Sequence, residues 1–441
     1  MGAPNLPVMP IRHDLQSVVA HTNLQRIRER ILSRTEKTKG GDVSSFRANG
    51  DVHANDGQHT MRTRTIHAGE DRSEPVRPLS QPIYQSSVYA VDDFQTSADR
   101  LLADPPQANY SRDHFPNVVA LERAVADLEG AQDGYAVSSG MAAISLVLLA
   151  LLSADDHIVI AEGSYCDTEA LLKQVLGRFN VRYTSVWIDD AEALEAAITP
   201  RTRLVFAETI ANPSMQVVDI DAISRIAHRH GALLIVDNTF ATPILCRPIE
   251  HGADLVVHSA TKFLGGHHDL SAGVIVGERG PLQTVRENGY LLGSLVGAMD
   301  AWLAVRGIRT LAPRMSWICQ TAVQVAEMLV AHPLVAEVSF PGLASGKQRE
   351  VASRILPDGF GGMIRFRLRD GQVAAEQVLR ALRLIPYAPS LGGTTTTICC
   401  PPSSTPCGLN DGCLRLSIGL ESAGDITRDL EQALATLAVP G

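Results

Sequence analysis

The sequence predicts an α/β protein built on a mostly parallel β-sheet. From Gly134 onward, short apolar segments alternate with longer segments of helical periodicity, which is the pattern of consecutive strand–helix–strand units. The 441 residues suffice for one large α/β unit and a smaller domain. Hydrophobic residues make up 45% of the chain and charged residues 20%, so we expect a globular protein with a sizeable core.

The individual elements follow from these segments. Buried strands are predicted at residues 157–161, 181–187, 204–207, 232–236 and 255–258. Helices are predicted between them, at residues 141–152, 168–176, 191–197 and 221–229. After Gly293 the helical segments lengthen, which predicts helices at 295–311 and 316–331, and then a strand at 363–368 and a helix at 374–382. This change of pattern predicts a second, smaller α+β domain.

We therefore expect three parts along the chain. Residues 1–61 form a leader, residues 62–295 a large domain with an N-terminal arm, and residues 296–441 a small C-terminal domain. In the leader, Leu24, Ile27 and Ile31 repeat at helical spacing before a Gly- and Asp-rich linker. This helix either docks on the main body or on a second subunit, or belongs to a partly disordered appendage.

Charge and cysteine content exclude several classes of protein. The 39 Lys and Arg against 48 Asp and Glu give a net charge of −9, which disfavours nucleic acid or an anionic membrane surface as a partner. The longest apolar segment, 144–152, is too short to span a bilayer. Seven cysteines and no secretory pattern at the start make the cytoplasm the expected compartment.

Metal binding has two candidate clusters, and we expect neither to hold a metal. The cysteines between Cys399 and Cys413 lack the paired spacing of a zinc site, so a loop with incidental thiols is the preferred interpretation. His258, His267 and His268 have no acidic or cysteine partner at helical spacing, and a structural role is preferred. Cys246 and Cys319 fall in apolar surroundings and are predicted core residues.

Polar side chains follow the apolar strands where ligands bind in parallel sheets. Asp237 ends one strand, Lys262 follows the next, and Ser139 and Gly140 open an apolar helix. Taken singly, these residues are explained as a strand-end cap, a solvated charge and a helix N-cap. Together they provide an amine for an aldehyde cofactor, a carboxylate for its pyridine nitrogen and donors for its phosphate. The combination indicates a pyridoxal 5'-phosphate (PLP) site.

Seven ordered motifs resemble the Cys/Met metabolism, or trans-sulfuration, family of PLP-dependent enzymes. That family includes cystathionine γ-synthases, cystathionine γ- and β-lyases, methionine γ-lyases and O-acetylhomoserine sulfhydrylases. The resemblance runs from about Thr65 to the C-terminus and implies fold-type I, with a mostly parallel sheet of the seven-stranded type flanked by helices. The motifs are Tyr110-Ser111-Arg112, Ser138 to Ala143, Asn212-Pro213, Val236 to Phe240, Ser259 to Lys262, Ser390 to Gly393 and Leu414 to Glu421.

The resemblance implies a role for each matching residue. Lys262 would bind the cofactor aldehyde as an imine and then move protons on the substrate, and Asp237 would pair with the pyridine nitrogen. Tyr165 would stack on the cofactor ring and act as acid or base near the leaving group. The implied cofactor-binding set is Tyr110, Arg112, Ser139, Gly140, Met141, Tyr165, Asn212, Asp237, Ser259, Thr261 and Lys262.

Substrate binding and assembly are implied in the same way. Arg415 would clamp the substrate carboxylate, assisted by Asn212 and by the backbone around Ser390. In the family, the residues that correspond to Tyr110 and Arg112 reach the phosphate in the neighbouring subunit. The resemblance therefore implies a homodimer with shared active sites, and commonly a tetramer of two such dimers.

The substrate-facing positions depart from the family's pattern. Pro389 replaces an acidic residue, Thr394 to Thr397 replace a hydrophobic-Glu-Ser/Thr segment, and Cys166-Asp167-Thr168 replaces Gly-Gly-Thr or Gly-Cys-Thr. Asp167 either accepts from a polar or cationic leaving group or caps the following helix.

We therefore expect γ-elimination or γ-replacement on an unusual γ-substituted L-amino acid, with the chemistry centred on Lys262. Two alternatives stay open. One is a β-eliminating C–S lyase, which would release pyruvate. The other is a non-catalytic relative that binds the cofactor, against which the presence of Lys262, Asp237, Tyr165 and Arg415 argues.

Overall fold

The computed structural model describes residues 59–70, 78–102, 109–112, 115–187, 191–401 and 411–438. The predicted leader helix and its linker lie outside the described residues, as does Cys407. Among the described helices, none is both long and apolar enough to cross a membrane.

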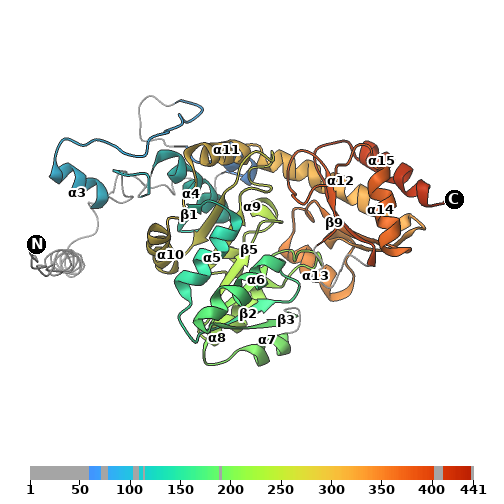
Figure 1. Cartoon of the computed structure of the whole chain (residues 1–441), viewed down its shortest axis with the longest axis horizontal. Coiled ribbons are helices and arrows are strands. Elements are labelled where there is room, and N and C mark those ends of the chain that lie inside the picture. Colours follow the sequence, from blue (N-terminus) through green and yellow to red (C-terminus); the bar gives the residue numbers. More distant parts are fainter. Residues whose placement is uncertain are drawn as a thin grey trace, which may run out of the picture. The chain divides into compact units, whose positions relative to one another are not determined.

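A seven-stranded sheet forms the centre of the larger part of the described chain (Figure 1). Its strand order is β1-β7-β6-β5-β4-β2-β3, and only β7 runs antiparallel to its neighbours. The strands are β1 (Asp133–Val137), β2 (His157–Ala161), β3 (Arg182–Val186), β4 (Thr202–Glu208), β5 (Leu233–Asp237), β6 (Leu255–Ser259) and β7 (Gly273–Gly277).

Helices cover both faces of this sheet because its strands are apolar on both sides. Leu204 and Phe206 pack with α5, α6 and α10, whereas Val205 and Ala207 pack with α4, α7, α8 and α11. The helices are α4 (Pro116–Glu129), α5 (Gly140–Leu151), α6 (Cys166–Gln174), α7 (Ala191–Ala197), α8 (Ile220–Arg229), α9 (Thr242–Leu245), α10 (Arg279–Leu292) and α11 (Ala298–Ile308).

The N-terminal arm and the connections of this part contain shorter elements. They are α2 (Met61–Ile66), α3 (Phe94–Leu102) and the 3₁₀ turns η1 (Leu176–Phe179) and η2 (Pro248–His251). The arm runs along α11, where the Trp302 indole donates to the Gln81 carbonyl at 2.7 Å and Arg309 donates to the Leu79 carbonyl at 2.6 Å.

A four-stranded antiparallel sheet follows, in the order β10-β11-β9-β8. The long helix α12 leads from α11 towards this second sheet in Figure 1. The strands are β8 (Val335–Ser339), β9 (Met363–Leu368), β10 (Thr397–Cys399) and β11 (Cys413–Ser417). The helices are α12 (Leu311–Ala331), α13 (Gly346–Ile355), α14 (Gly371–Ala381) and α15 (Ala423–Ala435), with 3₁₀ turns η3 (Pro341–Leu343) and η5 (Thr436–Ala438).

The expected fold class is confirmed by this mostly parallel sheet flanked by helices. Strand β7, with the sequence Gly-Val-Ile-Val-Gly, was not among the predicted strands, although it is a short apolar segment like those that were. It pairs antiparallel between β1 and β6, so it lies within the sheet rather than at its edge. The division near residue 295 stays a prediction, and α11 packs against α4 on the large sheet.

The helix predicted over 295–311 is α11, which is three residues shorter at each end, and the helix predicted over 316–331 begins earlier, at Leu311, as α12. A buried arginine of α12, Arg314, lies at the junction of the two helices. Its guanidinium donates to the carbonyls of Gly307 at 2.9 Å and Phe263 at 2.8 Å, so the end of α11 and the loop after Lys262 share one donor. Burial lowers the pKa of Arg314 to about 10.

Candidate active site

The predicted amine and carboxylate come from neighbouring parallel strands. Asp237 is the last residue of β5, and Lys262 lies in the loop after β6, where its Nζ is 3.5 Å from the Ser390 hydroxyl. Asp237 pairs in register with Val257 of β6, so both loops leave the same edge of the sheet. Both side chains are half-buried.

The N-terminus of α5 lies beside the loop that carries Lys262. Ser139 caps the helix by accepting from the Ala142 amide at 3.0 Å, and the first-turn amides of Gly140 and Met141 have no acceptor within the helix. A Cβ atom at Gly140 would lie 2.6 Å from the Ser259 Cβ, so only glycine allows this approach. The first-turn amides and the Ser259 hydroxyl therefore lie together, in an arrangement that suits an anion.

Arg415 reaches this region from β11 of the second sheet. It is 6% exposed and donates to the Asn212 side-chain oxygen at 2.9 Å and to the Pro389 carbonyl at 3.1 Å. Ser390, which follows Pro389, accepts from Lys262. The structure thus brings together the residues expected to bind the substrate carboxylate.

Burial shifts the pKa of several groups at this site. Burial, and then the nearby Arg415 charge, lowers the pKa of Lys262, which favours the neutral amine. Burial raises the pKa of Asp237, although its hydrogen bonds with Thr239 oppose that shift. A cationic ring nitrogen next to Asp237 would compensate the cost of burying its charge.

Asp167 lies in the first turn of α6, which begins at Cys166, two residues earlier than predicted. Its carboxylate lies near the Tyr165 hydroxyl. Burial, and then the neighbouring Asp167 carboxylate, raises the pKa of Tyr165, which keeps the phenol protonated. Tyr165 itself is the N-cap residue of α6 and makes no side-chain capping bond.

Glu208 is a buried site residue that the sequence analysis missed. It ends β4, pairs in register with Asp237, and accepts from the backbone amides of Tyr165 at 2.6 Å and Asn212 at 2.8 Å. Burial, and then the neighbouring Asp237 charge, raises its pKa. The signal was present in the sequence, since Glu208 directly follows a predicted strand, as Asp237 does.

Thr261 and Thr239 fix the loop around Lys262. The Thr261 hydroxyl and the Ala272 backbone bond each other in both directions, at 3.1 and 3.3 Å, and the Ser259 amide donates to the Thr239 hydroxyl at 2.8 Å. The hydroxyl of Thr261 is thereby partly engaged with the backbone.

Tyr110 and Arg112 are not brought to Lys262 by the described part of the chain. The Arg112 guanidinium stacks on the Tyr290 ring at 4.4 Å and donates to its hydroxyl at 3.2 Å. Tyr110 is 45% exposed and lies under the same guanidinium at 5.6 Å.

The candidate metal residues have other roles where the structure describes them. His258 Nε2 lies 2.6 Å from Glu129 Oε1, and both side chains are fully buried. His267 Nδ1 lies 2.8 Å from the Gly265 carbonyl oxygen. Cys246 and Cys319 are buried, as predicted. Within the described ranges, no three His, Cys, Asp or Glu side chains are placed to hold a metal ion.

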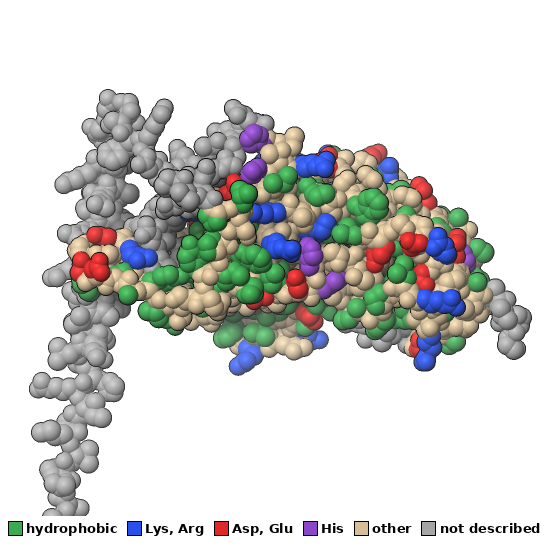
Figure 2. All heavy atoms as spheres, turned by 90° about the horizontal axis from the view of Figure 1, so that it is seen from above, with side chains coloured by type: hydrophobic (Ala, Val, Ile, Leu, Met, Phe, Trp, Pro, Cys, Tyr) green, Lys and Arg blue, Asp and Glu red, His purple; other side chains and the backbone are tan. Residues whose placement is uncertain are grey.

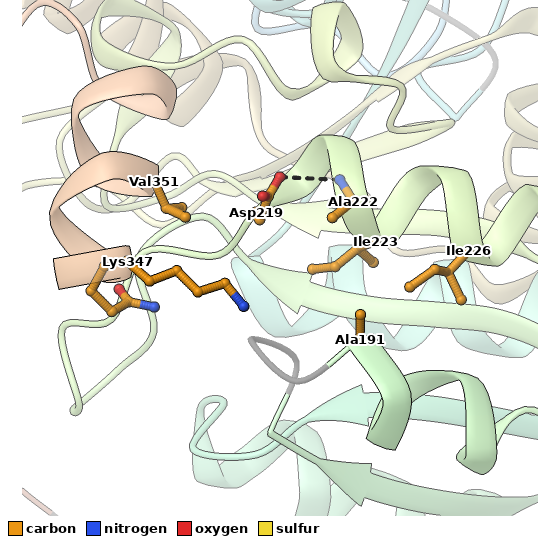
Figure 3. Close-up of a pocket in the computed structure, with 8 residues that line it drawn as sticks. Ala191, Asp219, Ala222, Ile223, Ile226, Lys347 and Val351 are labelled. Carbon is orange, nitrogen blue, oxygen red and sulfur yellow. Dashed lines mark hydrogen bonds between the residues drawn. The ribbon is translucent and has the colours of Figure 1, made fainter.

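Figure 3 shows a separate pocket between α8 and α13. Ile223, Ile226 and Val351 supply its apolar walls, and Asp219 caps α8 by accepting from the Ala222 amide at 3.1 Å. None of the predicted site residues lines this pocket.

The residues at the sheet edge fit PLP. An amine with a lowered pKa, a buried carboxylate and an anion-binding helix N-terminus supply partners for its aldehyde, ring nitrogen and phosphate. Lys262, Asp237, Gly140, Met141 and Ser259 would hold the cofactor in these roles.

Known proteins agree with this interpretation. The model of the family described as Cys/Met metabolism PLP-dependent enzyme matches residues 62–435. The chain is 41% identical to an L-methionine gamma-lyase of Pseudomonas deceptionensis, over 88% of this chain and all of that protein. It is 40% identical to a cystathionine beta-lyase of Lactococcus lactis subsp. cremoris, over 85% of this chain and 99% of that protein.

A solved structure extends the match to the fold. The crystal structure of metB from Corynebacterium glutamicum superposes with a TM-score of 0.79 and 34% identity, and the match covers 86% of this chain and 99% of that one. The resemblance noted in the motifs is thereby confirmed across both sheets. The chain belongs to the Cys/Met metabolism family and is a PLP-dependent enzyme.

Proposed function

We propose that the enzyme catalyses γ-elimination or γ-replacement on a γ-substituted L-amino acid, such as a homoserine ester, a thioether or another γ-activated amino acid of specialised metabolism. The convergence of Lys262, Asp237 and Arg415 supports PLP-dependent chemistry on an α-amino acid. The observation that carries the γ-directed part of the proposal is the 41% identity to an L-methionine gamma-lyase.

Arg415 and Lys262 would act on different groups of the substrate. The Arg415 guanidinium would bind the α-carboxylate and would give up part of its hydrogen bonding with Asn212 and the Pro389 carbonyl. Ser390, next to Pro389, lies beside Lys262. PLP, when bound, supplies an electron-withdrawing ring at Cα. Lys262 then removes the Cα proton and carries protons between carbons, since its lowered pKa favours the amine that accepts them.

Tyr165 would donate the proton that the γ-leaving group needs. Its raised pKa keeps a proton on the hydroxyl across the neutral range, so the donor is present when the bond to Cγ breaks. The same side chain would stack on the cofactor ring, which places the hydroxyl near the substrate's outer carbons.

Asp167 would select the leaving group. Its carboxylate is exposed and acts on the pKa of the neighbouring Tyr165 hydroxyl, which places it near the proposed proton donor. Asp167 does not occupy the N-cap position, which is Tyr165, and its place in the first turn of α6 also suits the alternative that it stabilises the helix terminus. A carboxylate at this position would favour a leaving group with a hydrogen-bond donor or a positive charge and would repel an anionic one.

Three homoserine esters of related structure test this role. O-glycyl-, O-acetyl- and O-succinyl-L-homoserine carry a cationic, neutral and anionic acyl group. We expect kcat/KM to fall in that order and Asp167→Asn to reduce the preference for the glycyl over the succinyl ester about 5- to 10-fold. Cofactor content, measured by visible absorbance, should not change. Loss of the cofactor with an unchanged ester preference would make the role of Asp167 structural.

We further propose that the enzyme works as a homodimer with shared active sites, and that two dimers form a tetramer. Hydrophobic side chains gather on the face on which α11 lies (Figure 2), and large exposed ones are found on the arm and on α10. Leu79, Phe94 and Leu291 are 89%, 90% and 79% exposed, which is typical of an interface left uncovered in one chain. Tyr110 and Arg112 on the same arm would reach the phosphate in the partner's site.

A β-eliminating C–S lyase is the second candidate, and one observation favours it. The cystathionine beta-lyase relative is 40% identical over nearly its whole length, almost as similar as the methionine lyase. Lys262, Asp237 and Arg415 would serve either reaction.

The product distinguishes the two reactions. We expect L-methionine or O-acetyl-L-homoserine to yield 2-oxobutanoate and ammonia, or a replacement product when a thiol is supplied, identified by mass spectrometry. L-Cystathionine is a substrate for either reaction and tells them apart, since γ-cleavage leaves 2-oxobutanoate and β-cleavage leaves pyruvate. Pyruvate from cystathionine, with neither 2-oxobutanoate nor a γ-replacement product from any of the three substrates, would contradict the γ-directed proposal.

A further inference from the structure

Glu208, which was not among the predicted site residues, accepts two main-chain hydrogen bonds from residues of the site. Its Oε1 accepts from the Tyr165 amide at 2.6 Å and its Oε2 from the Asn212 amide at 2.8 Å. Only 6% of the residue is exposed, so water does not replace these bonds easily. One side chain thus joins the connection from β2 to α6 with the loop that follows β4.

The two amides belong to residues on either side of the site. Tyr165 carries the phenol that lies beside Asp167, and the Asn212 side chain accepts from the Arg415 guanidinium at 2.9 Å. The bonds therefore form one chain, Tyr165–Glu208–Asn212–Arg415, which runs from the large sheet to β11 of the second sheet. A shift of Glu208 would displace both ends.

Glu208 is also fixed relative to Asp237. The two residues are register partners at the ends of β4 and β5, and main-chain bonds of the sheet hold them side by side. The Asp237 carboxylate in turn accepts from the Thr239 amide at 2.8 Å. Because Glu208 lies beside Asp237 and accepts from the loops that carry Tyr165 and Asn212, both loops are held at set positions relative to Asp237.

We propose that Glu208 is a positioning residue, which fixes Tyr165 and, through Asn212, Arg415 at set distances from Asp237. This inference rests on the proposed function for the roles of Tyr165 and Arg415. Glu208 touches neither substrate nor cofactor in this account. Its effect is to order two loops before the substrate arrives, so that less binding energy is spent on arranging them.

Glu122 offers a matched control for Glu208. It is also a buried glutamate, 4% exposed, and accepts from a backbone amide, that of Ala136, at 2.9 Å. Its ion-pair partner is Arg286, and it lies between α4 and β1 rather than at the cofactor edge. Glu122→Gln therefore reports what the loss of a buried carboxylate does without a link to the site.

The experiment compares Glu208→Ala, Glu208→Gln and Glu122→Gln as PLP-loaded proteins. For Glu208→Ala we expect kcat/KM to fall about 100-fold, with KM and kcat both affected, because each end of the chain is displaced. Glu208→Gln keeps one good acceptor but turns its amide donor towards the second N–H, so we expect an intermediate loss. Glu122→Gln should leave KM and kcat within about twofold.

Two readouts do not depend on turnover. Visible circular dichroism of the bound cofactor reports how the protein, and Tyr165 in particular, faces the ring, and we expect at least about a twofold decrease in Glu208→Ala at equal cofactor content. The spectral change on titrating L-norvaline, which has the α-carboxylate but no leaving group, gives a dissociation constant that should rise about tenfold or more. If the wild type turns over no ester or thioether, the proposed function fails and these two readouts still decide the role of Glu208.

Unchanged circular dichroism and norvaline affinity in both Glu208 variants would overturn the proposal. Equal changes in Glu122→Gln would also overturn it, because they would show a general effect of removing a buried carboxylate. If Glu208→Ala does not fold, the comparison of Glu208→Gln with Glu122→Gln decides between these outcomes.

Discussion

Burial determines the protonation of the side chains at this site. It lowers the pKa of Lys262 and raises those of Asp237, Glu208 and Tyr165, and the charged neighbours Arg415, Asp237 and Asp167 add to three of these shifts. The same low-polarity surroundings thus favour a neutral base in Lys262 and a protonated acid in Tyr165. The shift of the Lys262 pKa makes the amine a readier proton acceptor, and the shift of the Tyr165 pKa keeps the phenol a proton donor.

Lys262→Ala tests the central residue. We expect the visible band of lysine-bound cofactor to disappear and turnover to fall at least about 1000-fold, because the residue is both attachment point and proton carrier. Lys173→Ala, on the exposed side of α6, is the control and should keep both the visible band and the turnover. A normal visible band in Lys262→Ala would contradict the assignment.

At the scale of elements, buried charged side chains connect helices to strands and loops. Arg314 joins the end of α11 to the loop after Lys262, and Glu122 joins α4 to β1 through the Ala136 amide. Burial raises the pKa of Glu122 to about 7, although the Arg286 charge opposes the shift. Between about pH 4.5 and pH 7, Glu122 is therefore mostly protonated in the folded protein and mostly ionised in the unfolded chain.

This linkage predicts how stability depends on pH. A carboxyl group with a raised folded-state pKa contributes stability that is present below its ordinary pKa of 4.5 and is lost as pH rises through about 7. We expect this contribution to fall by on the order of 2–3 kcal/mol between about pH 5 and pH 8, since one pKa unit corresponds to about 1.4 kcal/mol.

Glu122→Gln should flatten that part of the curve. The measurement is the Tm of wild-type and variant holoenzyme at both pH values, where the wild type loses more on going to the higher pH. An equal loss in both proteins would show that Glu122 does not titrate in this range.

Element positions followed well from periodicity, whereas side-chain contacts did not. The strand at 157–161 and the helix at 191–197 have the predicted bounds, because apolar alternation and helical spacing are local properties. Asp237 and Lys262 were found by their place after strands. The contact of Glu208 with the Asn212 amide and the bond from Arg415 to Asn212 depend on loop geometry, which spacing does not encode.

For the whole molecule, the arm is the feature that one chain leaves unexplained. Arg112 and Tyr110 match cofactor motifs, but the Arg112 guanidinium lies on the rings of Tyr290 and Tyr110 instead, and large apolar residues of the arm and α10 are exposed. A second copy of the chain on this face would cover the exposed apolar residues and would bring Arg112 and Tyr110 to its own cofactor site.

Subunit mixing tests this arrangement. Lys262→Ala and Arg112→Ala place defects on opposite sides of a shared site, so a hybrid dimer contains one site with both defects and one with neither. We expect differently tagged, co-expressed hybrids to recover about half of the wild-type activity per dimer, although each parent is impaired. Hybrids no more active than the average of the parents would show that each site is built from one chain.

The most direct test of γ-directed chemistry is proton exchange at Cβ. Expulsion of a group from Cγ requires loss of a Cβ proton, whereas β-elimination requires loss of the Cα proton alone. The measurement is proton NMR of L-norvaline incubated with the holoenzyme in D₂O, where no leaving group interrupts the exchange. We predict that both the α- and β-proton signals disappear, and that Lys262→Ala abolishes both losses. Exchange at Cα with the β-protons retained would contradict the account.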